Sequence, residues 1–122
     1  DDKLAWKPAP TAKSALEIVN HTVAAMKGMA TTLKTGAWGI PEFQPATDRA
    51  QAQSMIREAT GEYAAAVAAL SPADLERTVQ APFGSFPMRE FSGFGVVELL
   101  NHRGQITYLQ TLLGDNEDHF GM

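Results

Sequence analysis

Residues 96–113 read VVELLNHRGQITYLQTLL, and this stretch decides the fold class. Apolar residues recur in it at three- and four-residue steps, which is typical of an amphipathic helix: Leu99, Ile106, Leu109 and Leu113. At about 100° per residue, His102 falls inside this apolar arc, while Glu98 and Gln105 lie at its edge. A carboxylate and an imidazole directed into a core need hydrogen bonds or a cation, because burying them unpaired is costly. The outward face is expected to carry Arg103, Thr107, Gln110 and Thr111.

Two further stretches have the same helical pattern. The first helix is expected over residues 14–34, because Ser14 and Glu17 have the spacing of a capping box, and it should end at Gly36. The second is expected over residues 47–70, where apolar residues again recur at helical spacing. Three long amphipathic helices predict an all-α bundle.

The segments between these helices are harder to interpret. Thr47 is expected to be the N-cap of the second helix, and Ser71-Pro72-Ala73-Asp74 predicts a short helical turn. Residues 37–45 are expected to form a loop with apolar anchors. Residues 78–95 contain prolines, glycines and four phenylalanines. A short hairpin is one interpretation of this segment, but its prolines favour an ordered crossover loop.

Length and composition argue against several classes of protein. The 122 residues are enough for one domain, spanning residues 1–122, with a single core. The net charge is −4 without any basic stripe, which argues against a nucleic-acid partner. No apolar run is long enough to span a membrane. There is no cysteine, so disulfides and thiolate metal sites are impossible, and a cytoplasmic location is expected.

The histidines suggest a metal site. His21 on the first helix and His102 on the last can face each other in a bundle, and Glu98 lies one turn from His102. Two imidazoles and a carboxylate suit a divalent transition ion with open positions for water. Such an ion would activate a water or bind a thiol as thiolate. The alternative is that Glu98 and His102 form only an i,i+4 pair and that His21 is a surface histidine.

A longer pattern along the chain adds to this interpretation. Trp6-x-Pro8 is followed by Ile18-Val19-Asn20-His21 and then by residues 101–115, NHRGQITYLQTLLGD. In these motifs and their order the chain resembles the DinB-like, YfiT-type family of metal-binding helical bundles, which includes thiol-dependent transferases and isomerases. The resemblance implies a four-helix bundle with a divalent ion, often zinc or nickel, on three histidines. One corresponds to His21, and the other two form a His-x-x-x-His pair that ends at His102.

The sequence departs from this family pattern in two ways. Glu98 stands where the first histidine of the pair is expected. Because glutamate can bind the same ions through oxygen, the implied metal ligands are His21, Glu98 and His102. In addition, the family's first helix precedes the Trp-x-Pro segment, with which this chain almost begins. We therefore expect a bundle of the DinB-like four-helix type that lacks its first helix in this chain, or that another chain completes.

Two functions follow from these observations. The protein is either a metal-dependent thiol S-transferase or hydrolase for a small-molecule substrate, or a non-catalytic bundle with a stress-related or dimerisation role. A homodimer is expected, because three helices leave one flank uncovered and the alanine-rich helix over residues 47–70 can pack closely on a neighbour. Gln105 either hydrogen-bonds a metal ligand or caps a backbone group. His119, in the acidic tail, is expected to be inert.

Overall fold

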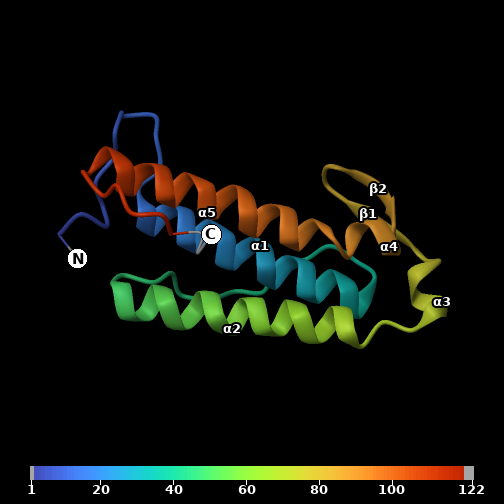
Figure 1. The fold of residues 1–122 in the computed structure, drawn as a ribbon. Helices are drawn as coiled ribbons and strands as arrows, with labels where there is room; N and C mark the ends of the chain where they lie inside the picture. The colour runs from blue at the N-terminus through green and yellow to red at the C-terminus, as the bar shows by residue number, and fades with distance from the viewer. Residues whose placement is uncertain (1, 120–122) are drawn as a thin grey trace.

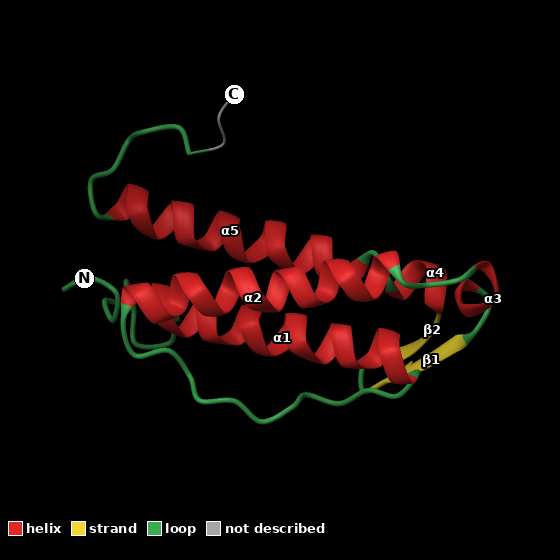
Figure 2. Ribbon diagram, turned by 90° about the horizontal axis from the view of Figure 1, so that it is seen from below, coloured by secondary structure: helices red, strands yellow, loops and turns green. Residues whose placement is uncertain are grey.

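A computed structural model describes residues 2–119. Three long helices lie side by side, and a hairpin with two short helices packs at one end (Figures 1 and 2). The elements in chain order are α1 (Ala15–Thr35), α2 (Arg49–Ala68), α3 (Pro72–Leu75), β1 (Thr78–Ala81), β2 (Gly84–Pro87), α4 (Met88–Phe91) and α5 (Phe94–Leu112). The predicted all-α class is confirmed, with one small two-stranded sheet added. Within residues 2–119, no helix combines the length and the apolar character that crossing a membrane requires.

The connection over residues 36–48 determines the direction of the helices. It leads the chain back along the bundle, so that α1 and α2 run the same way, whereas α5 runs in the opposite direction (Figure 1). α1 packs against both of the other long helices, and most extensively against α2. α1 and α5 therefore form an antiparallel pair, and it is this pair that carries the candidate site.

The helix ends follow the predicted capping with one exception. Ser14 caps α1 in a capping box with Glu17, and Gly36 ends the helix in the left-handed conformation at φ 78°. The N-cap of α2 is Asp48, so the prediction of Thr47 is wrong. The Asp48 carboxylate accepts from the backbone N–H of Gln51 at 2.8 Å. Aspartate caps a helix at least as well as threonine, and here Asp48, one residue after Thr47, is the N-cap.

The hairpin corrects the interpretation of residues 78–95. β1 and β2 pair antiparallel, from Thr78 opposite Pro87 to Ala81 opposite Gly84. The prolines do not prevent this pairing, because Pro82 lies in the turn between the strands and Pro87 is the last residue of β2. Proline is tolerated at such positions, where no ladder hydrogen bond from its nitrogen is needed. The crossover loop is therefore a hairpin followed by the short helix α4.

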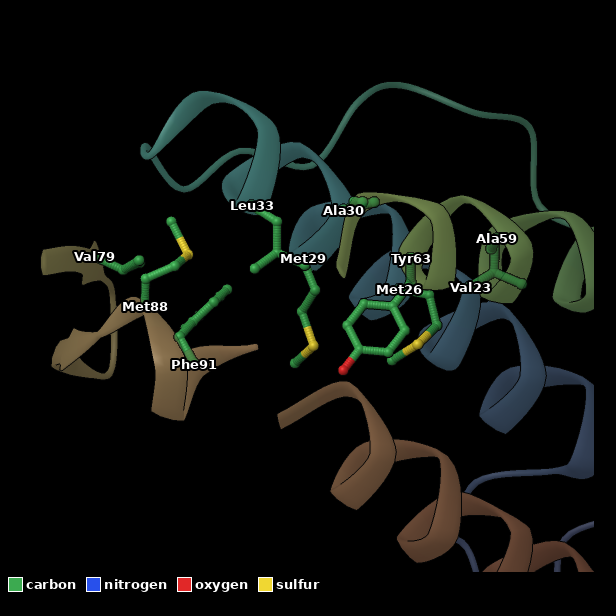
Figure 3. Close-up of a cluster of buried hydrophobic side chains, with 11 residues drawn as sticks. Val23, Met26, Met29, Ala30, Leu33, Ala59, Tyr63, Val79, Met88 and Phe91 are labelled. Carbon is green, nitrogen blue, oxygen red and sulfur yellow. The ribbon is translucent and has the colours of Figure 1, made fainter. Parts of the chain in front are cut away.

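The core lies at the end of the bundle where the hairpin packs (Figure 3). Its buried members come from α1, α2, β1 and α4: Val23, Met26, Met29, Ala30, Leu33, Ala59, Tyr63, Ala66, Val79, Met88 and Phe91. Towards the other end, Leu16 and Val19 of α1 are only half-buried. With Ile56 of α2 and Ile106 of α5 they line an apolar groove of about 140 Å³. The main core thus lies at one end of the bundle, and only smaller buried positions such as Ile18, Ala52 and Leu109 lie towards the other.

The first turn of α5 is held against α2 by Tyr63. The Tyr63 hydroxyl donates a hydrogen bond to the Ser92 carbonyl, and its ring lies directly on the backbone of Gly95. A Cβ atom at Gly95 would lie 2.4 Å from the Tyr63 ring, which leaves no room for any other residue without displacing the ring. This contact fixes the start of α5, and with it the position of Glu98 one turn later.

The outward face of α5 is more apolar than the helical pattern indicates. Arg103 and Thr111 are exposed as predicted, but Thr107 and Gln110 are half-buried. The exposed apolar side chains on this helix are Val96, Val97, Leu100, Tyr108 and Leu112. Large apolar side chains gathered on one exposed face are typical of a surface that another protein covers.

Candidate metal centre

The structure brings the three predicted metal ligands together between α1 and α5. His21 is exposed on the second turn of α1, Glu98 is half-buried, and His102 is 8% exposed one turn further along α5. The two imidazole rings meet edge to face, with centroids 4.8 Å apart. One ligand atom from each residue lies within 4.8 Å of the other two. Metal binding by this group stays a prediction, but the geometry it requires is present.

Both ring nitrogens of His102 have partners on α5. Nδ1 lies 2.8 Å from the amide oxygen of Gln105, and Nε2 lies 3.0 Å from a carboxylate oxygen of Glu98. Since the amide oxygen only accepts, Nδ1 donates to it, and Nε2 remains as the ligand atom. Gln105 therefore hydrogen-bonds the His102 side chain, which is the first of the two roles expected for it. Because a carboxylate also only accepts, the Nε2 contact needs a proton or a cation between the two groups.

The three residues fit a divalent transition ion. Zinc–nitrogen bonds are about 2.0–2.1 Å long and zinc–carboxylate bonds are similar, so in the tetrahedral shell that zinc prefers two ligand atoms are about 3.4 Å apart. Ligand atoms within 4.8 Å of one another reach this separation by rotation of the His21 side chain. His21 is exposed and free to make it. Two imidazoles and a carboxylate are also ligands that zinc and nickel accept.

The electrostatics favour His21 as a neutral ligand. Partial desolvation is the main cause that lowers the pKa of His21 below its usual 6.5. Electrostatic interactions with His102 and Lys13 lower it further, and the interaction with Glu98 partly offsets them. At neutral pH the imidazole therefore carries no added proton, and its lone pair is available to an ion.

His119 lies outside this group of three. Its Nε2 is 2.9 Å from the Asp115 carboxylate, within the exposed tail. His119 also lines a cavity of about 330 Å³ between the long helices, and His102 is another of the residues that line it. Among residues 2–119, the candidate metal ligands that come together are His21, Glu98 and His102. That His119 is inert stays a prediction.

Sequence reasoning missed a second group of residues beside the site. Trp38, Phe83 and Phe94 line a cavity of about 350 Å³ that His21 and Glu98 also line. From the sequence alone, core or lid packing is the favoured role for these aromatic residues over a substrate-binding wall. The signal that was available is the unusual density of phenylalanine over residues 83–94, which becomes informative only when the hairpin is known to fold back beside α5.

Comparisons with known proteins agree with this fold. None of the curated proteins compared with the chain matches it. The crystal structure of the DinB-like protein YjoA from Bacillus subtilis superposes with a TM-score of 0.79 at 21% identity, over 98% of this chain and 82% of that one. At this identity the match establishes the fold. The sequence matches the DinB superfamily over residues 1–106. The chain therefore belongs to the DinB superfamily.

Proposed function

We propose that this protein holds one divalent transition ion, zinc or nickel, on His21, Glu98 and His102, and uses it as a metal-dependent thiol S-transferase or hydrolase for a small molecule. The observation that carries the proposal is the convergence of three ligand atoms within 4.8 Å from two antiparallel helices. The donor set supports it, since water or substrate can complete the coordination of an ion held by three side chains. When bound, such an ion supplies a Lewis acid for a water or a thiol.

The residues of the chain have distinct tasks in this proposal. His102 is buried and is oriented by the hydrogen bond from its Nδ1 to Gln105, so it is the anchoring ligand. Glu98 lies on the same helix face and offsets part of the positive charge of an ion. His21 is exposed and, with Glu98, lines the neighbouring cavity, so a bound ion would be accessible from this side. A substrate would approach from this side.

Elemental analysis of protein purified without added metal tests the proposal. We expect one equivalent of zinc or nickel per chain at pH 7.5, because the lowered pKa of His21 leaves its imidazole free to bind an ion there. Retention should fall at acidic pH, as protons compete with the ion for its ligands. The lowered pKa of His21 moves this loss to a lower pH than an ordinary histidine would. A His119→Ala variant, which removes a histidine outside the site, should keep its metal. Protein that neither retains an ion nor binds one on titration would contradict the proposal.

The outward face of α5 favours a second candidate function, a homodimer whose role is association. Val97, Leu100 and Tyr108 are large apolar side chains exposed on α5. Gly104 lies among them, with open space where its side chain would be. A second copy of α5 can approach closely at such a position. This candidate does not require a metal.

We expect light scattering to report a dimer at micromolar concentration. Leu100→Glu should convert it to a monomer, because a charge would be buried in an apolar interface. Ala65→Glu on the exposed face of α2 is the matched control and should leave the dimer intact. A monomeric parent protein would refute the homodimer. Dissociation by Ala65→Glu alone would assign the interface to α2 instead.

A further inference from the structure

We infer that the cavity between α1, α5 and the hairpin binds an uncharged aromatic group of the substrate, whose donor atom reaches the metal site. This inference rests on the proposed function and names the class of substrate. The cavity has a volume of about 350 Å³, within the range of sites for small molecules. Its apolar wall comes from four segments of the chain: Met29, Trp38, Ile40, Phe83 and Phe94.

The polar groups of this cavity are the metal ligands themselves. His21 and Glu98 line it on the α1–α5 side. A compound lying in the cavity therefore has its donor group directed to the ion and its remaining atoms against the apolar wall. Sites of this composition, apolar with a few polar groups at one place, are typical of orienting pockets.

The charges around this cavity favour an uncharged group over an anionic one. No lysine or arginine is among the described residues that line it. By contrast, two cavities that His102 lines contain Arg103 and Lys13. A phosphate or sulfonate against the aromatic wall, away from the proposed ion, would have no cationic side chain to pair with, which is unfavourable. We therefore expect the group that binds against this wall to be uncharged.

The aromatic side chains of the wall are arranged to receive a flat ring. Trp38 and Phe83 meet edge to face, with ring centroids 5.5 Å apart, and Phe83 and Phe94 are 6.4 Å apart. Aromatic rings favour such edge-to-face and offset contacts over other geometries. Phe83 is 55% and Ile40 is 49% exposed. The wall thus leaves apolar surface in water that an aromatic ligand would cover.

The wall is held in place before any ligand binds. A backbone bridge between Ala37 and Gln80 ties the loop after α1 to the hairpin. Gly28 lets this loop lie directly on α1, because a Cβ there would be 3.0 Å from Ile40 and 3.5 Å from Trp38. A cavity formed in advance spares the ligand the cost of ordering the loop. The expected ligands are arenes with a metal-binding donor, such as aryl thiols.

Two hydroxamates test this assignment on the full chain loaded with Co²⁺. Acetohydroxamate and benzohydroxamate have the same chelating group, and only the second has a ring. We expect benzohydroxamate to bind at least about tenfold more tightly, from the apolar area that its ring buries. The cobalt absorption spectrum reports binding at the metal. The fluorescence of Trp38, in a Trp6→Phe background, reports filling of the cavity.

Variants separate the cavity from the metal. Phe83→Ala should remove most of the preference for benzohydroxamate while acetohydroxamate binding stays unchanged. Leu112→Ala is the matched control, since Leu112 is also largely exposed, at 46% against 55%, and lies at the far end of α5 from the cavity. It should keep the preference. A sulfonate group at position 4 of benzohydroxamate should remove the tighter binding that the ring gives, because no lysine or arginine is among the described residues that line the cavity.

The outcomes distinguish this inference from the proposed function. If Co²⁺ binds but the ring gives no preference, or Phe83→Ala does not change the preference, the aromatic cavity is refuted and the metal site stands. If no Co²⁺ binds, the proposed function fails. Benzyl alcohol added to the metal-free protein then tests whether the cavity binds an aromatic group. A Trp38 fluorescence change that Phe83→Ala abolishes would support it, and no change would refute it.

Discussion

Replacing His102 by alanine is expected to abolish binding of the divalent ion, with a loss of affinity well beyond 100-fold. Removing a residue that only orients a ligand already costs about 10- to 100-fold, and His102 is the buried member of the three proposed ligands. The remaining His21 and Glu98 come from different helices and would hold an ion weakly. Isothermal titration with Zn²⁺ and with Ni²⁺, supported by elemental analysis, measures the change.

Two further variants make this test specific. Glu98→His restores the histidine that the family pattern has at this position and should tighten zinc binding, whereas Gln105→Leu should weaken it about 10- to 100-fold by releasing the His102 ring. Circular dichroism establishes that each variant keeps its helices. If His102→Ala binds zinc as tightly as the parent protein does, the three residues are not the metal site.

Phe91→Ala is expected to lower the free energy of unfolding by about 3–5 kcal/mol, the usual cost of truncating a fully buried phenylalanine. Phe91 has no exposed surface, and its ring packs on those of Trp38 and Phe94. Its loss leaves a cavity between the hairpin end of α1 and the start of α5. Urea denaturation, followed by helical circular dichroism, measures the change.

Phe83→Ala is the matched control for this prediction. It removes the same atoms eight residues earlier, from a side chain that is more than half exposed. We expect it to cost less than about 1 kcal/mol, as is usual for substitutions near the surface. The same variant is then suitable for the hydroxamate experiment, since it should fold normally. Equal destabilisation by the two substitutions would contradict the assignment of Phe91 to the core and Phe83 to the cavity wall.

The helices could be predicted from the sequence because their signals are local. The capping box of Ser14 and Glu17, the glycine at position 36 and the apolar spacing over residues 96–113 act within one or two turns. The hairpin could not, because the effect of a proline depends on its place in the strand pairing. Pro82 would disrupt a strand but suits a turn, and the sequence does not give the pairing register.

Part of the candidate site, too, could be predicted from local signals, and part of it could not. Glu98 and His102 are four residues apart, so helical geometry alone places them on one face. Nothing local connects them with His21, which lies on another helix. A bundle only allows the two histidines to face each other, and the family resemblance favours that arrangement. The aromatic cavity was missed because its wall combines α1, the loop after it, the hairpin and α5. Its residues are read as core residues until the topology brings them beside the ligands.

The position of the three ligands along the chain has a consequence for folding. His21 belongs to the first long helix and the other two to the last. An ion bound to all three would therefore cross-link the first long helix to the last and close residues 21–102, about two thirds of the 122-residue chain, into one loop. A cross-link over so long a loop restricts the unfolded chain more than a short one does. In a protein without cysteine, the ion would restrict the unfolded chain as a disulfide does in other proteins. Unlike a disulfide, it could be removed by a chelator.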